Sequence, residues 1–201
     1  MFKSKVISKW EAALGLGLVI TIIMSLCSFG VECSTIRSDV LRLHILANSD
    51  SKEDQTLKLK VRDEILKRTK DIFANADNIE SATENARANL GKIEQIARSV
   101  IKAQGYKYSV SANVAKSNFT TRHYGRYTLP AGVYNAVKIV IGEGAGHNWW
   151  CVMYPSLCLP SAVDNYDLAL NKSEQDVVEN YNKYEIKFKA VELFEQLKEW
   201  F

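Results

Sequence analysis

The chain has 201 residues, of which 47% are hydrophobic and 24% are charged, a composition typical of a globular protein with its own core. Its formal net charge is +3, and the basic residues are dispersed among acidic ones. Because a nucleic-acid interface needs a clustered basic face, this balance argues against a nucleic-acid partner.

The N-terminus has the pattern of an export signal. Three lysines precede an uncharged run of twenty residues, 12–31. Small residues allow cleavage after Gly30, whereas the run is also long enough to span a bilayer. We therefore expect residues 1–33 to be a signal peptide or a membrane anchor, with cleavage favoured, and the rest of the chain to lie outside the cytoplasm.

The next segments predict a strand and two helices. Residues 39–47 alternate between apolar and polar, which is typical of a half-buried strand with Arg42 and His44 toward solvent. The polar cluster 48–54 has the spacing of a helix N-terminus, and a helix is expected from about residue 53 to 70. A second helical pattern covers residues 78–103 and ends before Gly105.

Strands are expected in the middle of the chain. Residues 106–114 alternate in polarity, and residues 119–129 are expected to pair with them as the next antiparallel strand. Residues 133–141 form a third, largely buried strand, followed by three glycines in 142–146 and an apolar segment, 149–154. The glycines favour a tight turn, so this stretch predicts a β-hairpin.

The expected organisation is an α+β domain, in which two long helices pack on an antiparallel sheet. Residues 34–160 make up this secreted domain. Residues 161–184 are polar without clear periodicity and are expected to be a linker or lid, and residues 185–201 regain the spacing of a helix.

Four residues in the segment 149–158, which follows the third strand, are candidates for a chemical or binding role. Six residues separate Cys151 from Cys158, outside the cytoplasm, where disulfides persist, so a disulfide is favoured over buried thiols, a metal site or a catalytic thiol. Trp149 and Trp150 are adjacent in a strand and point to opposite faces, so we expect one in the core and the other free to meet a partner.

Two blocks of the sequence are specific enough to compare with known families: LRLHILANSDSKEDQTLKLKVRDEIL at 41–66 and GRYTLPAGVYNAVKIVIGEGAGHNWWCVMYPSLC at 125–158. Both resemble the stage II sporulation protein R family of endospore-forming bacteria. Family members more often have Arg at position 44 and Pro at position 156; neither departure threatens the assignment, and both discourage a histidine mechanism. With the signal segment, the resemblance covers most of the chain.

The resemblance implies a signalling protein and not an enzyme, without a cofactor, a catalytic or metal site, or a small-molecule substrate. Such a protein is exported from the forespore into the intermembrane space, where it activates the membrane-embedded aspartic protease that processes pro-sigma-E. It touches the membrane through its N-terminal segment.

We hypothesise that two turn-rich polar segments form the contact surface for the protease. The candidate partner-binding residues are Asn48, Ser49, Asp50, Gly142, Gly144, Asn148, Trp149 and Trp150. One competing hypothesis is a cell-envelope cysteine hydrolase acting on peptidoglycan, with Cys151 as nucleophile and His147 or His123 as base. Another is a structural envelope protein held by a retained anchor.

Overall fold

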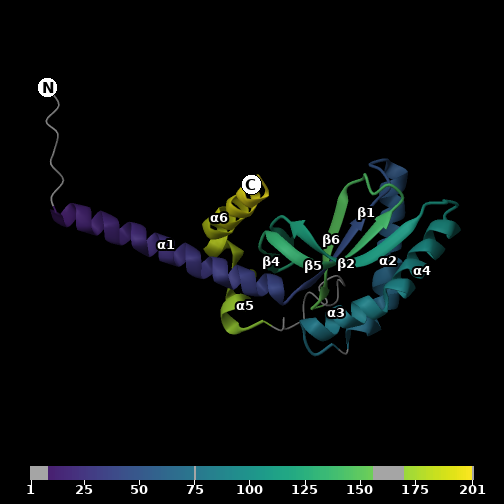
Figure 1. Ribbon diagram of the computed structural model, residues 1–201, viewed down its shortest axis with the longest axis horizontal. Coiled ribbons are helices and arrows are strands. Elements are labelled where there is room, and N and C mark those ends of the chain that lie inside the picture. The colour runs from purple at the N-terminus through teal and green to yellow at the C-terminus, as the bar shows by residue number, and fades with distance from the viewer. Residues whose placement is uncertain (1–8, 75, 156–169, 201) are drawn as a thin grey trace, which may run out of the picture.

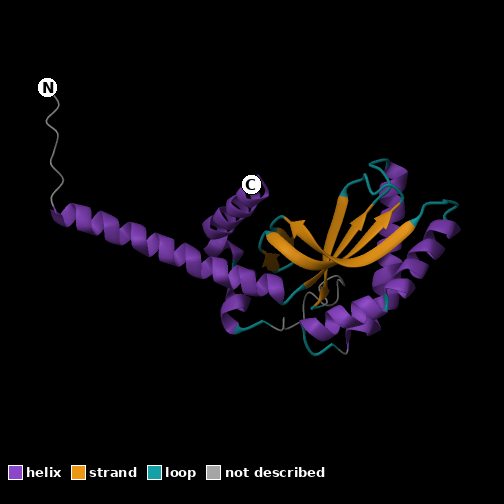
Figure 2. Ribbon diagram, in the orientation of Figure 1, coloured by secondary structure: helices purple, strands orange, loops and turns teal. Residues whose placement is uncertain are grey.

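The computed structural model describes residues 9–74, 76–155 and 170–200. A long helix, α1 (Lys9–Ser38), projects from an α+β domain and ends inside it (Figure 1). In that domain a four-stranded sheet has helices on both of its faces (Figure 2). The α+β class expected from the sequence is confirmed.

The sheet is mixed rather than purely antiparallel. It consists of β1 (Leu41–Leu46), β2 (Val110–Phe119), β5 (Gly132–Ile141) and β6 (Asn148–Tyr154) in the spatial order β2-β5-β1-β6. Strand β1 runs parallel to β5 and antiparallel to β6, and β2 runs antiparallel to β5.

The predicted hairpin of β5 with β6 is therefore wrong, because β1 lies between these two strands. Strand β1 is buried on both faces, including Arg42 and His44, which the alternation of polarity had placed toward solvent. Because helices cover both faces of the sheet, the central strand β1 is buried on both sides.

A second, two-stranded sheet packs beside the first. It is formed by β3 (Arg122–Tyr124) and β4 (Tyr127–Leu129), joined by a turn in which Gly125 has a φ of 57°. The prediction that residues 119–129 add a strand to the main sheet is wrong, because only Phe119 belongs to it.

Three helices cover one face of the main sheet. They are α2 (Lys52–Ala74), α3 (Ile79–Ala88) and α4 (Leu90–Ala103). The first was predicted, although it extends four residues further. The predicted single helix over 78–103 is two helices, because Asn89 leaves the helical conformation and its side chain donates to the carbonyl oxygen of Asn85 at 2.8 Å. Gly105 has the expected left-handed conformation, with a φ of 82°.

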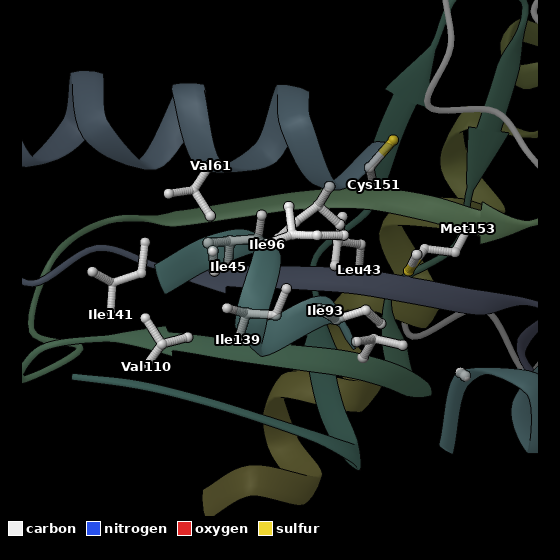
Figure 3. Close-up of a cluster of buried hydrophobic side chains, with 14 of the residues drawn as sticks. Leu43, Ile45, Val61, Ile93, Ile96, Val110, Ile139, Ile141, Cys151 and Met153 are labelled. Carbon is white, nitrogen blue, oxygen red and sulfur yellow. The ribbon is translucent and has the colours of Figure 1, made fainter. Parts of the chain in front are cut away.

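These helices and the sheet enclose the first core. Figure 3 shows its aliphatic side chains, which come from α2, α4 and all four strands. The labelled members are Leu43, Ile45, Val61, Ile93, Ile96, Val110, Ile139, Ile141, Cys151 and Met153.

The opposite face of the sheet is covered by α5 (Lys172–Glu179), α6 (Tyr181–Trp200), β4 and the end of α1. The second core includes Phe29 and Phe188, whose rings meet edge to face with centroids 5.2 Å apart. Helix α1 runs without interruption through residue 33, where the sequence placed the end of the signal segment.

The C-terminal region contains more regular structure than the sequence indicated. The predicted linker over 161–184 includes α5, which begins with a capping box between Asn171 and Glu174, so the expectation of an irregular stretch is wrong there. Residues 161–169 lie outside the described part of the chain. The C-terminal helix is present and starts at Tyr181, four residues earlier than expected.

Candidate functional site

Two loops cross at one end of the main sheet, and we call residues 47–51 and 142–147 the crossed loops. Because β1 and β5 are parallel, they end at the same edge, and the chain leaving β5 passes over the loop after β1 to reach β6. The loops are joined through their backbones: the N–H of Ala145 donates to the carbonyl of Asn48 at 3.2 Å, and that of Gly146 to the carbonyl of Ala47 at 3.0 Å.

We call residues 142–147 the upper loop and residues 47–51 the lower loop. The glycines of the upper loop allow this close crossing. A Cβ at Gly142 would lie 2.1 Å from the Oδ1 atom of Asn48, and one at Gly146 would lie 2.2 Å from the carbonyl oxygen of Ser49. Gly142 and Gly144 also have positive φ angles, 59° and 64°, which favour glycine. The glycine cluster therefore lies where two loops cross and does not form a hairpin turn.

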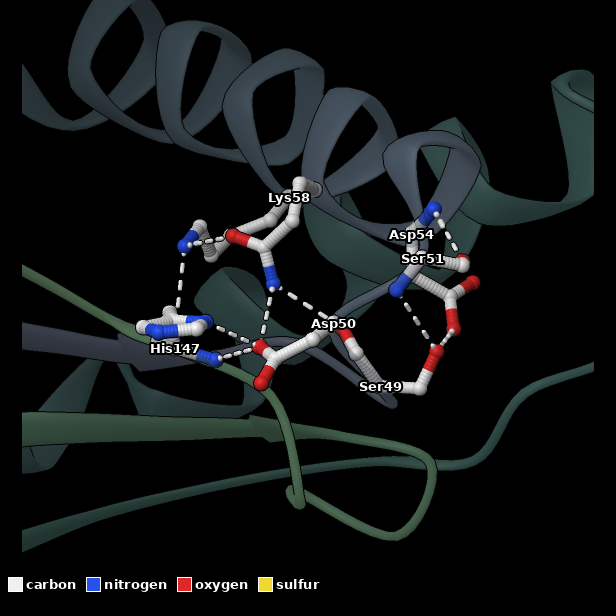
Figure 4. A network of polar contacts seen from close by, with 7 residues as sticks. Ser49, Asp50, Ser51, Asp54, Lys58 and His147 are labelled. Carbon is white, nitrogen blue, oxygen red and sulfur yellow. Dashed lines mark hydrogen bonds and ion pairs between the residues drawn. The ribbon is translucent and has the colours of Figure 1, made fainter.

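A buried carboxylate holds the lower loop. Asp54, in the first turn of α2, accepts a hydrogen bond from Ser49 Oγ at 2.6 Å (Figure 4). It also accepts one from Asn48 Nδ2 at 2.9 Å. The hydrogen bond from Ser49, followed by that from Asn48, holds the pKa of Asp54 below its usual range, although burial opposes this shift. The Oδ1 atom of Asn48 accepts from the backbone N–H of Glu143 at 3.1 Å, so Asn48 connects this carboxylate to the upper loop.

A buried lysine holds the upper loop from the other side. Lys58 is 4% exposed, and its Nζ donates to the carbonyl of His147 at 2.8 Å and to Gln55 Oε1 at 2.6 Å. Burial lowers the pKa of Lys58. Asp50 accepts from both the backbone N–H and the ring Nδ1 of His147, and the backbone hydrogen bond is the main cause of its lowered pKa (Figure 4).

The crossed loops expose part of this network to solvent. The side chain of His147 is 79% exposed and that of Asp50 is 53% exposed, and Glu143 and Asn148 are exposed beside them. By contrast, Asn48 and Ser49 are only partly exposed, and their polar side-chain atoms bond within the network. The predicted polar strip and glycine segment thus lie together, with Asp50, Glu143, His147 and Asn148 as their outward residues.

The two tryptophans point to opposite faces of the sheet, as expected, but neither is fully buried or fully exposed. Trp149 packs at the edge of the first core, with the guanidinium of Arg62 5.0 Å from its ring centroid. Trp150 packs at the edge of the second core, with Arg122 4.7 Å from its ring centroid. The expectation of one core tryptophan and one free tryptophan is wrong.

Two buried polar residues of β1 were missed by the sequence analysis. His44 is 8% exposed, and its Nε2 lies 2.7 Å from Oδ1 of Asn148 on β6. Burial is the main cause of its lowered pKa. Arg42 is fully buried between the rings of Phe119 and Tyr134, at 3.9 and 4.8 Å from their centroids. The structure shows that β1 is buried without interruption from Leu41 to Ile45. A single sequence, in which polar and apolar residues alternate here, does not reveal this burial.

The components of the cysteine-hydrolase hypothesis are not brought together. Cys151 is buried in the first core, whereas His123 packs against Tyr181 on the opposite side of the sheet, with ring centroids 4.6 Å apart. The ring of His147 bonds to Asp50. Cys158 lies outside the described residues, so its pairing with Cys151 stays a prediction. Within residues 9–74, 76–155 and 170–200 there is no cluster of three metal-binding side chains.

The fold and site define an α+β domain that follows a signal or anchor helix and presents crossed polar loops. Residues 37–164 match the model of the stage II sporulation protein R family. Over 123 residues the chain is 41% identical to stage II sporulation protein R of Bacillus subtilis (strain 168), a match that covers 61% of this chain and 55% of that relative's length. No solved structure matches. The chain belongs to the stage II sporulation protein R family, which is a family of sporulation proteins.

Proposed function

We propose that this protein is an exported, non-enzymatic signal that activates the membrane-embedded aspartic protease which processes pro-sigma-E. Its membership of a sporulation family supports this role. Its N-terminal helix, which has the length and composition of a membrane span or signal, supports export from the forespore into the intermembrane space.

The exposed part of the crossed loops is the proposed contact surface for the protease. The observation that carries this assignment is that Asp50, Glu143 and His147 project from loops that are anchored by the buried groups Asp54 and Lys58, with Asn148 exposed beside them at the start of β6. Anchored loops lose little conformational entropy when a partner binds, which is the usual advantage of a preorganised surface. The matched family region, 37–164, contains both loops.

The arrangement favours recognition over covalent catalysis. A thiol nucleophile requires a base within hydrogen-bonding reach, and Cys151 and His123 belong to opposite sides of the sheet. The exposed groups are instead a carboxylate pair, an imidazole and an amide, which are suited to hydrogen bonding with a protein partner.

Reconstitution in a non-sporulating bacterium tests this proposal. The full chain would be expressed with the candidate protease and the sigma factor precursor, and precursor cleavage would be followed on a gel. We expect cleavage only when all three components are present and the domain is exported. An intact precursor in the presence of an exported, folded domain would contradict the proposal.

Surface variants locate the contact. Because the side chains of Glu143 and His147 are exposed, we expect the double variant Glu143→Ala/His147→Ala to keep the fold and lose most of the cleavage. The matched control is His123→Ala, which removes an exposed histidine on β3 and is expected to leave cleavage unchanged. Equal cleavage with both variants, at equal protein levels, would exclude the crossed loops as the contact surface. Trp149→Ala and Asn48→Ala are informative only with a measurement of stability, because both residues also hold the fold.

A further inference from the structure

Helix α6 carries an apolar face that the described domain does not cover. Its side chains Ile186, Leu193, Phe194 and Leu197 are 84, 59, 56 and 49% exposed. Spacings of seven, eight and eleven residues place them on one side of a helix. The other side of α6 packs inward through Tyr184 and Phe188, whose rings contact Phe29 of α1.

The direction of α1 determines where a membrane would meet this face. Residues 12–31 carry no charge, and the large apolar side chains of this run are exposed from Leu14 to Val31, apart from Phe29. About 20 such residues cross the hydrocarbon core of a bilayer. The bilayer surface would therefore lie near Val31, next to the point where α1 enters the domain.

Helix α6 lies at that same level. An apolar groove between the two helices is lined by Leu26, Cys27, Gly30, Ala190, Val191 and Phe194. Figure 1 shows α6 running across the direction of α1, at the side of the domain from which α1 projects. A helix in this position lies along the surface of a membrane that α1 crosses.

The composition of α6 agrees with such a surface position. Four lysines and four glutamates alternate with its apolar residues, and Lys187 lies over the rings of Phe29 and Tyr184. Lysine stems cover apolar surface while the ammonium group stays in water, which is the usual arrangement at a membrane interface. An interfacial helix of this type buries its apolar side chains among lipid headgroups without spanning the bilayer.

We propose that α1 remains attached to the domain and that α6 lies on the phospholipid surface beside it, with Ile186, Leu193, Phe194 and Leu197 inserted between the headgroups. Cleavage after Gly30 would remove Phe29 from the second core, together with its contacts to α6. Two contacts with one bilayer hold the domain in a single orientation. This proposal does not depend on the proposed protease partner.

Photocrosslinking of the full chain in nanodiscs of phosphatidylethanolamine and phosphatidylglycerol tests the lipid contact. The photoreactive residue p-benzoylphenylalanine would replace Phe194 in one protein and Leu59 in another. Leu59 is the matched control, because it is an exposed apolar residue on α2, which packs on the opposite face of the sheet. We expect phospholipid adducts from position 194, detected by mass spectrometry, and only background from position 59. The same substitution at Ile186 provides a second position.

Crosslinks from position 194 to a second copy of the chain, or no lipid adduct at either 194 or 186, would overturn the proposal. The intact mass of the protein recovered from cell membranes provides an independent test. We expect the uncleaved chain, and a chain that begins at Val31 in the soluble fraction would show that α1 is not retained. Neither readout involves precursor cleavage, so a failure of the membrane proposal can be distinguished from a failure of the proposed function.

Discussion

The Oδ1 atom of Asn48 lies 2.1 Å from the position that a Cβ atom on Gly142 would occupy. These residues are far apart in sequence. Gly142 directly follows β5, and Asn48 is the second residue after β1. Their contact exists because β1 lies between β5 and β6 and the connecting chain has to pass over it. Asn48 fills the space that the missing side chain leaves and connects the upper loop to Asp54.

Gly142→Ala is expected to destabilise the protein by about 2 kcal/mol or more. The new methyl group would displace Asn48, and the positive φ of 59° would strain any residue other than glycine. Thermal or urea unfolding measures the effect. Gly105→Ala is the matched control, because Gly105 has a φ of 82° but open space around it, and it should show only the backbone strain of about 1 kcal/mol. Equal losses for the two variants would contradict the role of the close contact.

Asp54→Asn is expected to reduce the free energy of unfolding at pH 7 by about 2 kcal/mol, because hydrogen bonds from Ser49 and Asn48 to a charged carboxylate are weakened. The pKa of Asp54 is lowered in the folded state, so its stabilising contribution is present above the unfolded pKa of about 3.9 and is lost as the pH falls through the folded value. The variant should therefore show a weaker loss of stability in acid than the parent protein.

The control for Asp54 is Glu53→Gln, which removes an exposed carboxylate from the same first turn of α2. It should lose only a few tenths of a kcal/mol, from its weaker interaction with the helix dipole. Unfolding curves at several pH values distinguish the variants. The same pH dependence in Asp54→Asn and the parent would contradict the assigned role of this carboxylate.

His44 is expected to make the domain less stable in mild acid. Burial lowers its pKa in the folded state, and the nearby charges of Lys138 and Arg42 act in the same direction, although the hydrogen bond with Asn148 opposes them. As the pH falls below about 6.5, the unfolded chain takes up a proton at this histidine and the folded chain does not, so stability decreases.

His44→Gln should remove this decrease, measured as the free energy of unfolding between pH 7.5 and the onset of carboxylate titration. His123→Gln is the control, and it should keep the decrease because the buried histidine is still present. A decrease that survives in His44→Gln would mean that another group titrates in this range.

Cys151→Ala and Cys158→Ala are expected to lower the melting temperature by similar amounts, because a disulfide that closes so short a loop contributes about 2 kcal/mol and either change abolishes it. Iodoacetamide without reductant should leave residues 151 and 158 unmodified, whereas labelling after reduction in denaturant should modify both and serves as the positive control. Peptide mass spectrometry measures the labelling. Alkylation of Cys151 in the folded, unreduced protein would exclude the disulfide and reopen the nucleophile hypothesis.

The local pattern of the sequence predicted most of the helices and strands. The capping pattern of residues 48–54 identified the start of α2, and the alternation of residues 133–141 identified β5, because each pattern reflects a local requirement of its element. It failed at Asn89, where one residue that leaves the helical conformation divides a continuous apolar stripe between two helices. It also failed at α5, whose short apolar pattern lies within a polar stretch.

The composition of the site was also evident, since Asn48, Asp50, Gly142 and Asn148 were singled out as candidate residues for a contact surface. The sequence did not show which of these residues anchor the loops and which face outward. The sequence by itself determined the apolar N-terminal segment, the α+β class and the family, because these depend on composition, period and specific motifs. Only the tertiary structure decided that β1 separates β5 from β6 and that His44 and Arg42 are buried, because strand order and burial depend on contacts between residues far apart in the chain.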